Sequence, residues 1–149
     1  MNAQQQREGA ALNRAAMVSL AAAMEAYIEE VFRACIPLAY DFTPETIEKV
    51  SKQLSIPHTT DPGKIRSSFL VLGVEDIFAD LRWQKCSPVK VVEKLSQINQ
   101  IRNRCAHGNA ITVNGKPYTL TKQSVGTFLN FAQRFGERFH AHATGIFNE

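Results

Sequence analysis

The chain has 149 residues, of which 44% are hydrophobic and 21% charged, and its formal net charge is +3. This length accommodates one domain with a proper core, so we expect a single unit over residues 1–149. The composition is that of an ordinary globular protein and excludes a disordered tail. The mild positive charge suits an anionic ligand but does not by itself indicate nucleic-acid binding.

The cysteines and the N-terminal residues favour a cytoplasmic protein. The three cysteines lie far apart and form no Cys-x-x-Cys pair, which is typical of reduced thiols rather than of disulfides or a zinc site. Residues 1–8 are rich in glutamine and contain no apolar segment of a secretion signal. The uncharged stretch at residues 15–24 is too short to span a bilayer. We therefore expect no membrane association, no metal and no cofactor.

The first predicted helix runs from about Gln5 to about Cys35. Its many alanines favour a helix and allow close packing of a neighbour. Glu25 lies at the edge of the apolar stripe of this helix, and Pro37 is expected to end the helix. The stripe recurs at steps of three and four residues and consists of Met17, Leu20, Met24, Tyr27, Ile28, Val31 and Cys35.

A short second helix is predicted after residue 43. Thr43 is a suitable N-cap and Pro44 suits the first helical position, and the helix should extend to about Leu54. The loop at residues 55–60 carries one isolated histidine, His58, to which the sequence assigns no role.

The third predicted helix is capped by Thr60 or Asp61 and has Pro62 in its first turn. Gly73 is expected to end it, because glycine readily takes the backbone conformation that follows a helix. Residues 74–83 are predicted to add another helical turn or two.

The fourth helix has the clearest boundaries. Ser87 caps it, Pro88 occupies its first position, and Gly108 closes it. Its buried stripe is predicted to consist of Val91, Leu95, Ile98, Ile101 and Cys105.

A hairpin and a last helix complete the chain. Residues 111–113 and 118–120 flank Asn114-Gly115, which is a standard two-residue hairpin turn. The last helix is expected from about Lys122 to Ala143, with an aromatic core face of Phe128, Phe131, Phe135 and Phe139. The predicted fold is therefore all-α, a bundle of four to five helices with one small β-hairpin after the fourth helix.

The end of the fourth helix concentrates the polar chemistry of the chain. Arg102, Asn103, Arg104 and His107 fall within six residues, immediately before the glycine stop. At about 100° per residue, Arg102 lies in the middle of the apolar stripe, whereas Asn103 and His107 share a different face. Arg104 lies on the polar side of the helix, where a solvated face and an RNA-binding track are both open interpretations.

An arginine in an apolar stripe is costly unless it is paired. Two explanations fit: Glu25 of the first helix pairs with Arg102 inside the bundle, or the stripe opens onto a second subunit and Arg102 lines the cleft between two copies. His107 has a purely structural explanation as well, since a cation near a helix C-terminus stabilises the helix.

The motif Arg102-Asn103-x-x-Ala106-His107-Gly108 resembles the signature of the HEPN superfamily of helical-bundle ribonucleases. It is most similar to the bacterial RiboL-PSP-HEPN branch, which carries Arg-Asn-x-x-Ala-His-Gly at a helix end. That branch also has a Glu-x-Tyr in its first helix, matched here by Glu25-Ala26-Tyr27. The resemblance spans roughly residues 14–108.

The resemblance implies metal-independent endoribonuclease activity in a homodimer whose two motifs surround one cleft. In such a reaction the RNA 2′-hydroxyl attacks the adjacent phosphorus and leaves a 2′,3′-cyclic phosphate and a 5′-hydroxyl. Many such proteins are toxins or antiphage defence effectors that an antitoxin or another regulatory partner restrains.

The residue types suit the roles that the resemblance implies. His107 can move protons near neutral pH, and Arg102 is a permanent planar cation that fits phosphate oxygens. Asn103 can hold the imidazole or a phosphate oxygen, with Glu25 and Arg104 in supporting or RNA-binding roles. Two alternatives stay open: a non-catalytic HEPN-like module that binds a partner protein or a nucleotide, and a plain helical interaction domain in which Arg102 and Glu25 are structural.

Overall fold

The computed structural model describes residues 2–40 and 43–148, and these residues form five helices and one two-stranded hairpin. The all-α bundle with a small hairpin after the fourth helix is thereby confirmed. No helix in these ranges is long and apolar enough to cross a membrane. The elements are α1 (Ala3–Ala39), α2 (Pro44–Gln53), α3 (Pro62–Val71), α4 (Pro88–Ala106), β1 (Thr112–Val113), β2 (Lys116–Pro117) and α5 (Lys122–Ile146).

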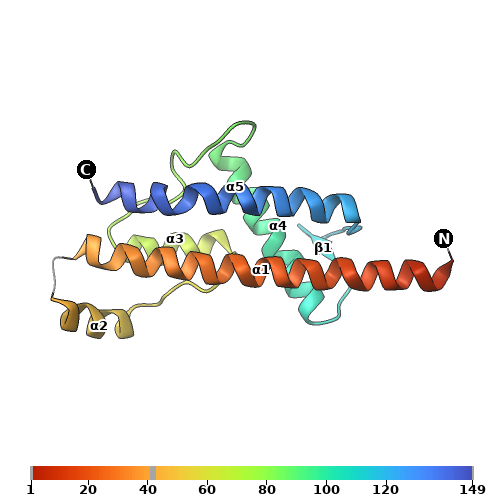
Figure 1. Cartoon of the computed structure of the whole chain (residues 1–149), viewed down its shortest axis with the longest axis horizontal. Coiled ribbons are helices and arrows are strands. Elements are labelled where there is room, and N and C mark those ends of the chain that lie inside the picture. The colour runs from red at the N-terminus through yellow and green to blue at the C-terminus, as the bar shows by residue number, and fades with distance from the viewer. Residues whose placement is uncertain (1, 41–42, 149) are drawn as a thin grey trace.

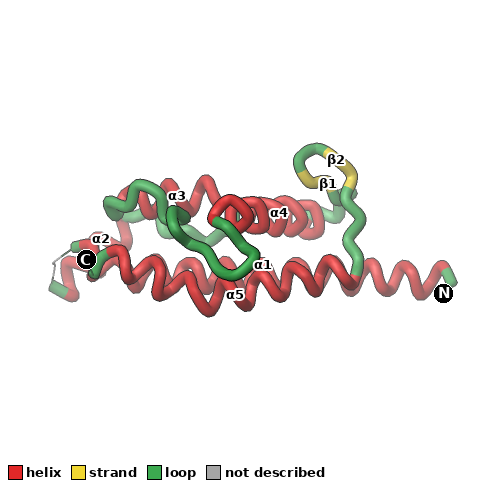
Figure 2. Tube along the Cα trace, turned by 90° about the horizontal axis from the view of Figure 1, so that it is seen from above, coloured by secondary structure: helices red, strands yellow, loops and turns green. Residues whose placement is uncertain are grey.

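The helices form two layers. α1 and α5 lie side by side and run in the same direction, and α4 crosses them steeply (Figure 1). Seen from above, α3 and α4 form the second layer, with the hairpin beside the end of α4 (Figure 2). The first turns of α1 extend beyond the rest of the molecule in both views.

α1 is longer than predicted at its C-terminal end. Pro37 lies inside the helix, so the prediction that it ends the helix was wrong. A proline within a helix removes one N–H donor, and only Leu38 and Ala39 follow Pro37 in this helix. The helix ends instead at Tyr40, whose extended backbone donates its N–H to the carbonyl of Ile36 at 3.1 Å.

The two short helices begin as predicted. Thr43 caps α2, and Asp61 rather than Thr60 caps α3 by accepting the Gly63 N–H at 3.1 Å. Gly73, with φ of 89°, follows the end of α3. Residues 74–83 contain turns but no helix, which corrects the expectation of a further helical turn or two. Asp80 has φ of 65°, a conformation incompatible with a right-handed helix.

The hairpin is shorter and closer to its turn than predicted. Its second strand is Lys116–Pro117 rather than residues 118–120. Asn114 and Gly115 both have positive φ angles, of 53° and 77°, and a two-residue turn of this kind pairs Val113 directly with Lys116. Strand pairing therefore begins at the residue after the glycine.

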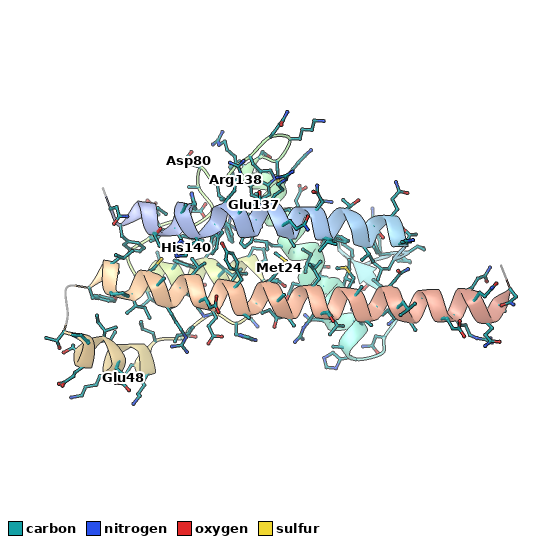
Figure 3. All side chains as sticks on the ribbon, viewed as in Figure 1. Met24, Glu48, Asp80, Glu137, Arg138 and His140 are labelled. Atoms are coloured by element: carbon teal, nitrogen blue, oxygen red, sulfur yellow. The ribbon has the colours of Figure 1, made fainter. Side chains whose placement is uncertain are left out.

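Aromatic side chains of α5 fill the space between the layers. Phe128, Phe131, Phe135 and Phe139 are buried, as predicted. Met24 of α1 lies between α1 and α5, whereas Glu48 lies on the outer side of α2 (Figure 3). Tyr27, the tyrosine of the Glu-x-Tyr sequence, bridges the two helices: its hydroxyl donates to the Gly136 carbonyl at 2.8 Å and accepts the His140 N–H at 3.0 Å. These contacts fix the position of α1 against α5.

Candidate functional site

The C-terminal end of α4 is closed by a Schellman motif. The N–H of Asn109 donates to the carbonyl of Arg104 at 2.9 Å, and the N–H of Gly108 donates to the carbonyl of Cys105 at 3.3 Å. Gly108 has φ of 67°, a left-handed conformation that a residue with a Cβ adopts only with strain. This closure leaves His107 as the C-cap, with its imidazole exposed.

Arg102 pairs with Glu25, as the first of the two explanations for an arginine in an apolar stripe requires. The Nε of Arg102 lies 3.2 Å from the Oε1 of Glu25. The carboxylate is buried, with 7% of the Glu25 side chain exposed, whereas 36% of the Arg102 side chain is exposed. The pair therefore lies at the boundary between α1 and α4, and part of the guanidinium reaches the surface.

The contact follows from how α1 and α4 cross. Glu25 is adjacent to Met24 on α1 and is buried together with the apolar stripe of that helix. A carboxylate in this position needs a cationic partner, because an isolated buried charge is strongly unfavourable. The guanidinium on the facing side of α4 supplies that partner.

His58 is a functional candidate that sequence reasoning missed. Its Nδ1 lies 3.0 Å from the Oε2 of Glu29, and its Nε2 lies 3.6 Å from the Oε2 of Glu25. The second carboxylate, Glu29, also pairs with Arg33 at 3.2 Å. Basic and acidic side chains alternate in a row of five residues, which we call the charged row: Arg102, Glu25, His58, Glu29 and Arg33.

The loop that carries His58 is anchored to α4. Thr60 is fully buried, and its hydroxyl donates to the Oδ1 of Asn99 at 3.5 Å. His58 is 29 positions from Glu29 in sequence, so no helical or strand spacing connects the two. The one available signal was the pair of carboxylates one turn apart on α1, since like charges four residues apart repel unless a cation lies near them.

The charged row lowers the pKa of one of its carboxyl groups, that of Glu29. Hydrogen bonds from His58 and, secondarily, from Arg33 lower the pKa of the Glu29 carboxyl below its ordinary value of 4.5. Tyr27 shows the opposite effect of its surroundings, since burial raises the pKa of its hydroxyl.

Asn103, Arg104 and His107 lie on the other side of α4 and line a hollow of about 400 Å³. Its wall is completed by residues from α4 and from the segment that includes the hairpin: Gln100, Asn109, Thr112 and Gly115. Asn103 connects the two sides of the helix, because its Oδ1 accepts a hydrogen bond from the Nη1 of Arg102 at 3.3 Å.

The structure therefore brings the five predicted residues to two adjoining places rather than one. Arg102 and Glu25 form part of the charged row, and Asn103, Arg104 and His107 line the hollow. This division matches the predicted angular separation of Arg102 and His107 around α4. Within the described residues, no group of three or more His, Cys, Asp or Glu side chains is arranged to hold a metal ion.

Replacing Glu25 by alanine should lower the free energy of unfolding by roughly 1–3 kcal/mol. Breaking a fully buried pair costs about 3–5 kcal/mol, and the expected loss is smaller because the partially exposed Arg102 can be solvated. Urea unfolding measures this difference. The matched control is Glu30→Ala at an exposed position of the same helix, expected within about 0.5 kcal/mol of the parent protein. Equal effects of the two substitutions would contradict the assigned contact.

The lowered pKa of Glu29 predicts a specific pH dependence. A carboxyl whose pKa is lower in the folded state stabilises the fold above its unfolded pKa, and this contribution disappears as the pH falls through the folded pKa. The free energy of unfolding should therefore fall less between pH 6 and pH 3 in Glu29→Gln than in the parent protein. His58→Ala should also make this fall in unfolding free energy smaller. Glu48→Gln, which removes the carboxylate of the exposed Glu48–Lys52 pair on α2, should leave the fall unchanged. A fall as steep in Glu29→Gln as in the parent would show that the hydrogen bonds to Glu29 are ineffective.

Comparison with known proteins places the chain in a family. No curated protein and no solved structure matches it. The model of the RiboL-PSP-HEPN family matches residues 2–144, which include α1, the charged row, the motif at the end of α4 and most of α5. The chain belongs to the RiboL-PSP-HEPN family.

Proposed function

We propose that the protein is a metal-independent endoribonuclease that uses Arg102 and His107. The observation that carries this proposal is the way in which Glu25 holds Arg102. The buried carboxylate engages the Nε of the guanidinium, while 36% of the arginine side chain stays exposed. An arginine held in this manner keeps terminal N–H groups available for phosphate oxygens, in an orientation fixed before the substrate arrives.

The transesterification requires two proton transfers and one charge to be stabilised. The 2′-oxygen loses its proton and forms a bond to the adjacent phosphorus, while the bond from phosphorus to the 5′-oxygen breaks and that oxygen gains a proton. His107 is exposed, and its ring has no hydrogen-bond partner among the described residues, so it is available for proton transfer. Arg102 stabilises the additional negative charge on the phosphoryl oxygens.

A homodimer completes the proposed site. Arg102 and His107 lie on different sides of α4, in the charged row and in the hollow respectively. A second copy that packs near the ends of both α4 helices places the arginine of one subunit opposite the histidine of the other. A two-fold interface of this kind contains two equivalent arginine–histidine pairs.

The cellular role is part of the same proposal. An RNA-cleaving HEPN protein that acts in the cytoplasm would serve as a toxin or an antiphage defence effector, with an antitoxin or regulatory protein that restrains it. One observation favours the alternative, a non-catalytic HEPN module that binds a partner protein or a nucleotide. An ion pair such as Arg102–Glu25 can also serve a purely structural purpose. The cleavage experiment separates the two.

Substitution of the two motif residues tests the mechanism. Purified protein should cleave mixed RNA in EDTA, and the new 5′ ends should accept label from polynucleotide kinase without phosphatase treatment, because they carry a hydroxyl. A general acid–base side chain contributes roughly 10²–10⁴-fold in rate, so His107→Ala should lose at least about a hundredfold. Arg102→Lys should be nearly as inactive as Arg102→Ala, because lysine keeps the charge and loses the planar fork.

The matched controls lie on α5. His140→Ala and Arg138→Lys change exposed residues of α5. Figure 3 shows Arg138 near Asp80, whereas His140 lies on the side of α5 that faces α1. Both variants should cleave at the parent rate. Cleavage that requires added magnesium and survives His107→Ala would reject the mechanism, and an absence of cleavage would favour the binding module.

Subunit mixing tests the dimer. Light scattering at tens of micromolar should give the mass of a dimer. Arg102→Ala and His107→Ala, each inactive alone, should regain about a quarter of the parent activity when mixed and re-equilibrated, because half of the dimers then hold one intact pair of two. A monomeric mass would contradict the dimer, and a dimer without regained activity would show that each subunit uses its own arginine and histidine.

A further inference from the structure

The hollow beside His107 is held open by hydrogen bonds from both ends of its wall. Gln100 of α4 clamps the hairpin turn, since its Oε1 accepts the Asn114 N–H at 2.8 Å and its Nε2 donates to the Asn114 Oδ1 at 3.2 Å. At the other end, Arg14 of α1 donates to the carbonyl of Asn109 at 3.0 Å. Hydrogen bonds within the chain therefore hold the two ends of this wall in place.

The lining of the hollow combines one cationic side with one neutral polar side. Arg104 and His107 lie on α4, and neither side chain has a hydrogen-bond partner among the described residues. The opposite wall consists of Asn109, Thr112 and Gly115, which offer amide, hydroxyl and backbone groups without charge. Among the residues that the structure describes, no aspartate or glutamate lines the hollow.

Three carbonyls at the end of α4 already have hydrogen-bond donors, which reduces the negative potential there. The C-terminus of a helix is electronegative because its last carbonyls lack partners. Here the carbonyls of Asn103, Arg104 and Cys105 already accept the N–H groups of His107, Asn109 and Gly108. The positive charge of Arg104 is therefore available to a ligand.

We propose that this hollow binds one unpaired nucleotide of a single-stranded RNA, with the phosphate toward Arg104 and His107 and the base against Asn109 and Thr112. A ligand with one anionic end and one neutral end rich in donors and acceptors fits this lining, and about 400 Å³ exceeds what a bare phosphate needs. A paired base cannot enter such a hollow, whereas an unpaired base offers its edges to side chains. This inference deepens the proposed function and rests on it for the choice of RNA.

Binding of mononucleotides tests the proposal without any cleavage. The four nucleoside 5′-monophosphates are titrated into ¹⁵N-labelled protein, with inorganic phosphate and a hexaglutamate peptide as comparison ligands. We expect saturable shifts of the amide signals of Asn109, Thr112 and Gly115, with the best nucleotide binding about tenfold or more tightly than inorganic phosphate.

A pair of matched tryptophan variants locates the site. Thr112→Trp fills the hollow and should weaken nucleotide binding at least about tenfold. Thr119→Trp makes the same change at an exposed position just beyond the hairpin and should bind as the parent does. The amide signals of α3, which does not line the hollow, must stay unchanged in both variants, which shows that the fold survives.

Three results would overturn the inference: no shift at the hairpin wall, equal binding of inorganic phosphate and nucleotides, or tighter binding of the acidic peptide. These results are distinct from failure of the proposed function. Protein that cleaves RNA but leaves the hollow empty refutes only the nucleotide site, whereas protein that binds nucleotides at the hollow but does not cleave RNA refutes only the ribonuclease.

Discussion

The site depends on the need to pair the buried carboxylate of Glu25. This side chain lies on α1 within the apolar surface that faces α4, and a charge there is tolerated only beside a cation. Arg102 meets the need at 3.2 Å from one carboxylate oxygen, and His58 approaches the other at 3.6 Å. One buried group therefore positions the motif arginine, the loop before α3 and the crossing of α1 with α4.

The backbone at the end of α4 determines the other half of the site. Gly108 in its left-handed conformation turns the chain back, so that the carbonyls of Arg104 and Cys105 accept hydrogen bonds and His107 stays at the surface. The hairpin that follows is fixed to α4 by Gln100, which gives the hollow a stable wall. A motif of a few residues thus acquires two environments, one around Arg102 and one around His107.

Local chemistry made much of this predictable. The caps of α2, α3 and α4, the glycine stop and the aromatic face of α5 all follow from interactions within one or two turns. The partner of Arg102 was predictable too, because a helix angle of about 100° per residue placed the arginine in an apolar stripe and the first helix offered one carboxylate at the edge of its own stripe.

What could not be predicted depends on distant contacts or on small differences at element ends. His58 reaches Glu29 across 29 positions through an irregular loop, for which no periodicity exists. Pro37 failed as a helix stop because it removes only one N–H donor, and Leu38 and Ala39 continue the helix after it. The second strand of the hairpin was misplaced by two residues because the pairing starts directly after the turn.

A double-mutant cycle between Glu25 and Arg102 tests the central claim most directly. Unfolding free energies are measured for the parent protein, Glu25→Gln, Arg102→Gln and the double variant. If the two side chains position each other across the α1–α4 crossing, the sum of the two single losses of stability should exceed the loss in the double variant by about 1–2 kcal/mol. Effects that add to within about 0.3 kcal/mol would show that the two residues act independently and would contradict the account.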